Sequence, residues 1–187
     1  HAARPAGTSR CLLPGPQIRL LPKPLILIVS CGVGRMLESV LLHLTRCPGG
    51  EQAVEVGVDL ARQFRARLRG LALLDTRRLE SVLRDCEAAV YASSELEGLR
   101  TAERNLQSIQ SQFCQASLTA GVDFDLRSVR ADPGVVLSEE SSSHDLLVAG
   151  APEPGISMGP ASGAELRSAE MVNVWIRRGR PILVARG

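Results

Sequence analysis

Apolar residues are gathered along the chain in short runs, and the longer segments between them have the spacing of amphipathic helices. Five runs have the length of buried strands: 40–44, 68–74, 124–129, 146–149 and 181–185. Helices are predicted at 51–64, 77–91, 95–120 and 164–178, with a further one opened by Asp132-Pro133. Strands that alternate with helices are joined by crossovers, which make the strands parallel and cover both faces of the sheet. The pattern therefore predicts a doubly wound α/β fold with a five-stranded parallel sheet.

The first 35 residues do not follow this alternation. Residues 1–24 hold five prolines and show little periodicity, a composition that resists packing. The apolar segment 25–34 can be interpreted as a strand, as the core of a secretory signal with Cys31 as its lipidated residue, or as part of an extension upstream of the fold. Because Met36 leads directly into the first strand, we predict an irregular basic N-terminal extension over 1–35 and a folded domain over 36–187.

Composition places the chain among ordinary globular proteins. Of its 187 residues 44% are apolar and 22% are charged, so the chain can bury a core. A net charge of +2 is too small to indicate polyanion binding, and an aromatic content of 3% leaves few rings on which bases could stack. We therefore expect no nucleic-acid partner.

The cysteines and histidines are scattered and form no metal-ligand pattern. The five cysteines lack a C-x-x-C pair, and free thiols of this kind are typical of a reducing compartment, which predicts a cytoplasmic protein. His43 lies inside the first strand and is expected to be a core residue with its polar atoms satisfied, whereas His144 lies at a strand entrance. No apolar run approaches the roughly 18 residues of a membrane span, so no membrane partner is expected.

The loop 150–163, GAPEPGISMGPASG, is the segment richest in candidate chemistry. It follows a buried strand and precedes a helix, on the side of the sheet where doubly wound folds bind their ligands. Glycines free of side chains and the hydroxyl of Ser162 could cradle a phosphate at the helix N-terminus. Glu153 opposes this interpretation because its carboxylate would repel the phosphate, and a plain surface loop is the alternative.

Four segments resemble universal stress proteins in their order and spacing, and the resemblance covers about four-fifths of the chain. They are VGVDLARQFRARLRGLALLD at 56–75, GVDFDLRSVRADP at 121–133, SHDLLVAG at 143–150 and VNVWIRRGRPILVARG at 172–187. The resemblance implies the sheet of the adenine nucleotide alpha hydrolase type, with strand order 3-2-1-4-5. Its fifth strand, 181–185, would lie at an edge whose free backbone groups favour a homodimer.

Nucleotide-binding members of this family carry an Asp at the end of the first strand and an apolar residue at the end of the second. The resemblance places Thr45 and Leu73 at these two positions. Thr45 offers a hydroxyl but no carboxylate to a nucleotide, so the first anchor of the site is altered.

The same members carry the motif G-x2-G-x9-G-[ST] after the fourth strand. Gly150 and Gly163 match its first and third glycines. Glu153 replaces the second glycine and Ala164 the closing hydroxyl residue, for which Ser162 is a substitute donor. The resemblance thus implies a degenerate phosphate site.

Together these features predict a regulatory module of the stress response that acts as a homodimer, with possible docking on a regulatory protein, and that needs no cofactor. The alternative is a switch that binds ATP or ADP, with Mg²⁺, and hydrolyses it weakly or not at all. A third hypothesis is a redox sensor that uses Cys47 or Cys114. The residues identify no catalytic base or nucleophile.

Overall fold

The computed structural model describes residues 17–21, 26–30, 37–84, 92–151, 175 and 180–185. Its strands form one seven-stranded sheet in the order β1-β2-β7-β6-β3-β4-β5. The five strands of the predicted domain are β3 (Ser39–Leu44), β4 (Arg67–Asp75), β5 (Phe124–Ala131), β6 (Leu146–Gly150) and β7 (Ile182–Ala185). They are parallel to one another, and numbered along the domain they follow the order 3-2-1-4-5. The predicted fold class is confirmed.

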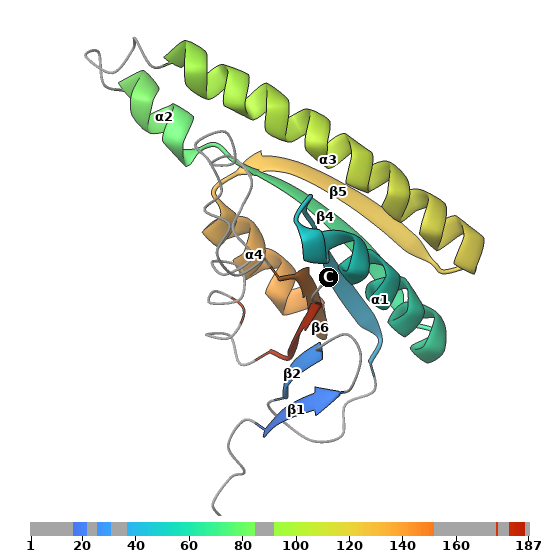
Figure 1. Cartoon of the computed structure of the whole chain (residues 1–187). Coiled ribbons are helices and arrows are strands. Elements are labelled where there is room, and N and C mark those ends of the chain that lie inside the picture. The colour runs from blue at the N-terminus through green and yellow to red at the C-terminus, as the bar shows by residue number, and fades with distance from the viewer. Residues whose placement is uncertain are drawn as a thin grey trace, which may run out of the picture.

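The helices cover both faces of this sheet (Figure 1). They are α1 (Pro48–Phe64), α2 (Arg77–Arg84), α3 (Ala92–Ala120) and α4 (Pro133–Ser143). In β3 to β6, even-numbered residues such as Leu42 pack with α1 and α3, and odd-numbered residues such as Leu41 pack with α4. In β7 the parity is reversed, with Leu183 on the α1 side and Ile182 on the α4 side. Of the predicted helix 164–178 the structure describes Trp175, which is fully buried on the α4 face and donates from Nε1 to the carbonyl of Pro181 at 2.9 Å. The two-layer core follows from the alternation of side chains along each strand.

Helix α1 begins three residues earlier than the sequence predicts, because two glycines allow its first turn to approach other backbone closely. A Cβ on Gly50 would lie 1.9 Å from the carbonyl oxygen of Thr45, and a Cβ on Gly49 would lie 2.6 Å from the amide of Ala151. The helix ends at Phe64, and its cap residue Arg65 adopts the left-handed conformation at φ 54°. Residues 48–50 thus form the closely packed first turn of the helix.

Part of the N-terminal segment differs from the expectation that residues 1–35 are irregular and outside the fold. Strand β1 (Gln17–Leu21) and strand β2 (Ile26–Ser30) form an antiparallel pair, and β2 pairs antiparallel with β7. Residues 26–30, ILIVS, are rich in β-branched side chains, and β7 offers them an outer edge of unpaired backbone groups. Of the three interpretations of the apolar segment 25–34, the strand is the one found in the structure, over residues 26–30.

Candidate functional site

The carboxyl ends of β3, β4 and β6 hold the three predicted nucleotide-site residues that the structure describes. Thr45 follows β3 directly and is 4% exposed. Gly150 is the last residue of β6 and is buried. Leu73 is also buried, but it lies two residues before the end of β4 and packs in the core on the α4 face. The predicted residues Ser162, Gly163 and Ala164, together with Glu153, lie outside the described residues.

The end of β6 is pressed against the N-terminus of α1. A Cβ on Gly150 would lie 2.6 Å from the carbonyl carbon of Gly49 and 2.7 Å from the amide nitrogen of Gly50. Ala151 donates its N–H to the carbonyl of Ala185 at 2.6 Å. Backbone therefore fills the space between these elements, and Gly150 serves close packing whether or not a phosphate binds beyond it.

A carboxylate does stand at this edge of the sheet, at the end of β4. Asp75 accepts hydrogen bonds from the guanidinium of Arg77 at 2.6 and 2.9 Å and from its backbone N–H at 3.0 Å. Burial alone would raise the pKa of Asp75, but these bonds and the nearby charge hold its pKa below the usual value. Arg77 thus engages this carboxylate.

His43 is the polar residue most deeply enclosed on β3. It is 2% exposed, and its Nδ1 has no hydrogen-bond partner in the part of the chain that the structure describes. Burial lowers its pKa to about 4, so the ring is neutral at neutral pH. The expectation of a buried histidine is confirmed, whereas the expectation that its polar atoms are satisfied is wrong.

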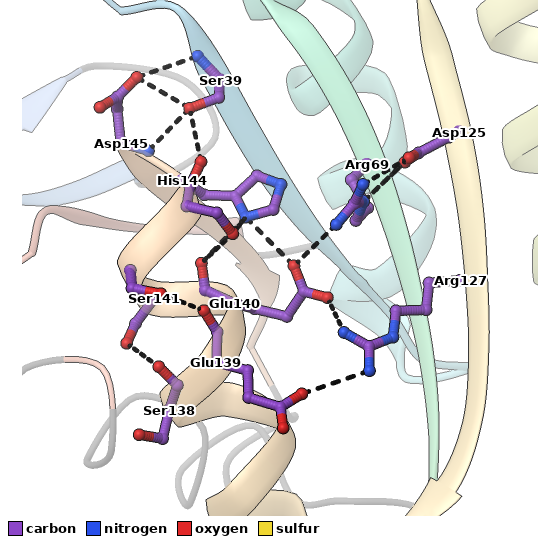
Figure 2. Close-up of polar contacts among 12 residues, drawn as sticks. Ser39, Arg69, Asp125, Arg127, Ser138, Glu139, Glu140, Ser141, His144 and Asp145 are labelled. Atoms are coloured by element: carbon purple, nitrogen blue, oxygen red, sulfur yellow. Dashed lines mark hydrogen bonds and ion pairs between the residues drawn. The ribbon is translucent and has the colours of Figure 1, made fainter.

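A larger polar cluster lies toward the opposite, amino-terminal end of the sheet, on the α4 face (Figure 2). Its centre is Glu140 of α4, whose side chain is 1% exposed. The carboxylate accepts from Arg127 at 2.5 Å and from Arg69 at 3.3 Å, and His144 Nδ1 lies 3.2 Å from it. Two guanidinium groups and a ring nitrogen surround the carboxylate and allow it to stay buried, and the two arginines tie α4 to β4 and β5.

Arg69 joins this cluster to the edge of the sheet. Its guanidinium also donates to both oxygens of Asp125, with distances of 2.7 to 3.0 Å. The hydrogen bond to Asp125 is the main cause that raises the pKa of Arg69, and Glu140 adds to it. Arg69 is therefore a permanently charged bridge between a buried and an exposed carboxylate.

Asp145 fixes the neighbouring strand starts. One of its carboxylate oxygens accepts from the hydroxyl of Ser39 at 2.8 Å and from the backbone N–H groups of Ser39 and Glu38 at 3.0 and 3.1 Å. The contact joins the start of β6 to the start of β3 (Figure 2).

A cavity of about 340 Å³ opens beside this cluster. It lies at the starts of β3, β4 and β5 and at the end of α4 and is lined by charged and polar side chains, among them Arg67, Asp123 and His144. Sequence reasoning directed attention to the other end of the sheet and missed it. The signal in the sequence is that charged residues occupy every second position in RLRG at 67–70 and in DFDLR at 123–127. On adjacent strands, this spacing places the charged side chains on the same face of the sheet.

Among the described residues, no group of histidine, cysteine and acidic side chains is arranged to hold a metal ion. Cys47 is buried and Cys114 is partly buried. Within the same residues, no helix has the length and apolar character needed to cross a membrane.

No family model and no curated protein matches this sequence. Among solved structures, the universal stress protein UspA from Lactobacillus plantarum superposes with a TM-score of 0.51 at 16% identity, over 82% of this chain and all of that one. The chain has the universal stress protein fold. Two further structures of such proteins give lower scores. One, in complex with cAMP, has a TM-score of 0.48 at 19% identity, over 81% of this chain and 98% of that one. The other, from Archaeoglobus fulgidus in complex with dAMP, has a TM-score of 0.47 at 9% identity, over 81% and 99%.

Proposed function

We propose that the chain is a regulatory module of the universal stress protein type that acts in the cytoplasm by binding rather than by turnover. The observation that carries this proposal is the carboxyl end of β3, where Thr45 stands in a buried position and supplies no carboxylate. A nucleotide base or ribose would find one hydroxyl there, and a neutral hydrogen bond contributes less than one to a charged group. The site is therefore weakly equipped for a nucleotide, and docking on another protein is the proposed mode of action.

The packing around Gly150 supports the same proposal. The backbone at 49–50 and at 150 is in contact, so side chains and ligand atoms are excluded from the space between α1 and β6. A phosphate would have to lie farther out, and the family resemblance gives Glu153 the place of the second glycine of the phosphate motif. The negative charge of that carboxylate disfavours a phosphate at close range.

A switch that binds ATP or ADP is the second candidate, and one feature favours it. Gly150 lies against the first turn of α1, where the helix dipole carries its positive end. With the hydroxyl of Ser162 and the backbone of Gly163, this end could attract a polyphosphate and its Mg²⁺.

Calorimetric titration with ATP and Mg²⁺ separates the two candidates. We expect no saturable heat from the wild-type chain at millimolar ATP, and measurable binding by the Thr45→Asp variant, in which the carboxylate is restored. Thr45→Asn is the matched control, because it has the shape of aspartate without the charge, and thermal unfolding of each variant checks that the buried substitution leaves the fold intact. Micromolar binding of ATP by the wild-type chain would instead support the switch.

We also propose that the module forms a homodimer on the edge of β7 when β2 does not cover that edge. In this chain β2 covers that edge, with Leu27, Ile28 and Val29 opposite Val184, Leu183 and Ile182. Dimerisation through β7 therefore requires that β2 first separate from β7, so release of the N-terminal strands controls assembly.

A further inference from the structure

The cavity at the amino-terminal end of the sheet has features of a binding site and is separate from the candidate nucleotide site at the carboxyl end. Its volume of about 340 Å³ lies at the lower end of the roughly 300–1,000 Å³ typical of small-molecule pockets. Three strands and the end of α4 form its walls, and these elements are fixed to one another by the Glu140 and Asp145 contacts. A rigid wall is what a preorganised site requires.

Most of the charge in this wall is already compensated. Arg69 binds Asp125 through two nitrogen atoms, and its third nitrogen donates to Glu140. Arg127 supplies the second cation beside Glu140. These groups hold each other in place and leave little capacity for a ligand.

Two charges of opposite sign remain available at the cavity. Arg67 and Asp123 both line it, and both are exposed. They are neighbours across β4 and β5, because the residues that follow them, Leu68 and Phe124, are partners in the parallel register. Within the described part of the chain, no hydrogen bond or ion pair engages either side chain. A guanidinium and a carboxylate thus stand side by side without neutralising each other.

His144 adds a directional group at the same cavity. The residue is 6% exposed, and Nδ1 faces two acceptors of Glu140, the carbonyl oxygen at 2.9 Å and a carboxylate oxygen at 3.2 Å. Nδ1 must therefore carry the proton, so in the neutral ring the other nitrogen, Nε2, is an acceptor. Nε2 lies on the side of the ring turned away from Glu140 and has no partner among the described residues (Figure 2).

We propose that this cavity binds a small zwitterion of the α-amino acid class, with its carboxylate on Arg67 and its ammonium group on Asp123. Nε2 of His144 accepts a further hydrogen bond from the ammonium group or from a hydroxyl of the ligand. A phosphate fits these groups less well, since Asp123 would repel it and the second guanidinium of the wall, Arg69, is already engaged. The proposal is independent of whether the opposite end of the sheet binds a nucleotide.

The test is a titration of the full chain, labelled with ¹⁵N, in which the ring nitrogens of His144 and the amides of residues 67 and 123 are followed by NMR. The probes are glycine and L-serine as zwitterions, acetate and methylammonium as the separate halves, and inorganic phosphate. We expect both amino acids to shift these signals saturably at millimolar concentration or below, and each half to bind at least tenfold more weakly.

Variants separate the proposed contacts from general charge effects. Arg67→Gln and Asp123→Asn are each expected to weaken amino-acid binding about tenfold or more. Arg100→Gln removes a charge from an exposed position on α3 and is expected to change nothing. The proposal would be overturned in favour of an anion site if acetate or phosphate bound the wild-type chain as tightly as glycine does, and bound Asp123→Asn more tightly than wild type. Signals that stay unmoved by every probe at millimolar concentration would also overturn it.

Discussion

At the scale of single residues, the neutral histidine enclosed in β3 makes stability depend on pH. The pKa of His43 is lowered from 6.5 to about 4 by burial, so between these values the unfolded chain takes up a proton that the folded chain does not. The stability contributed by the neutral ring is complete above pH 6.5 and is lost as the pH falls toward 4. On this account alone, the free energy of unfolding should fall by about 2 kcal/mol between pH 7 and pH 5.

Urea unfolding of the wild-type chain and of His43→Leu at both pH values measures this effect. Carboxylates also titrate in this range, so the informative quantity is the difference between the two proteins, which should shift by about 2 kcal/mol in favour of the leucine variant on acidification. At pH 7 the leucine variant should be no less stable, because it also removes an unpartnered buried nitrogen. Parallel loss of stability in both proteins would contradict the assignment.

The residues of the candidate sites show which positions a sequence can reveal. The family resemblance assigns Thr45 and Gly150 to the ends of the first and fourth strands of the domain, and both lie at the carboxyl edge of the sheet in the structure. The orphaned nitrogen of His43 could not be predicted, because hydrogen-bond partners come from elements distant in sequence. Arg67 and Asp123 were likewise invisible as a pair, since they are 56 positions apart and only the register of β4 with β5 makes them neighbours.

At the scale of elements, the packing of α3 on β4 depends on one glycine. A Cβ on Gly70 would lie 2.7 Å from Cε1 of Phe113, a ring that is fully buried and meets Phe124 edge-on at 5.4 Å. Gly70→Ala should therefore lower the free energy of unfolding by about 1–2 kcal/mol, the cost of overpacking less the gain in backbone entropy. Adding Phe113→Leu should recover part of this loss through an interaction energy of about 1 kcal/mol.

Gly98→Ala is the matched control for this substitution. It lies on α3 with no heavy atom within 4 Å of the new Cβ, so helix propensity should stabilise the protein by up to about 1 kcal/mol. Urea unfolding of Gly70→Ala, Phe113→Leu, the double variant and Gly98→Ala, each compared with wild type, measures both signs and the interaction energy. If Gly70→Ala and Gly98→Ala changed the free energy of unfolding equally, the ring of Phe113 would have to move aside without cost.

The elements themselves follow from the chain where local signals agree. The alternation of apolar runs and helical segments predicts the five parallel strands, and family resemblance supplies their order. The segment 26–30 was harder to interpret, because an apolar run behind prolines fits a strand or a signal equally well. Only the unpaired edge of β7, which exists after the sheet has formed, gives that run a partner.

At the scale of the whole molecule, the N-terminal strands compete with self-association. Antiparallel pairing with β2 uses the outer backbone groups of β7, which a second copy would need for the proposed homodimer.

The double variant Ile28→Pro/Val29→Pro should free the edge of β7. Successive N–H groups point to opposite sides of a strand, so one of the two prolines must remove a hydrogen bond to β7. We expect the wild-type chain to be monomeric by light scattering at micromolar concentration and the molar mass of the variant to double. Ile18→Pro/Arg19→Pro, which disturbs β1 and leaves the pairing of β2 with β7, should stay monomeric. A charge at Leu183 cannot replace this test, because its side chain is 3% exposed and lies in the core, where a charge would unfold the domain. A wild-type dimer whose mass is unaffected by the prolines in β2 would place the contact between copies on another surface.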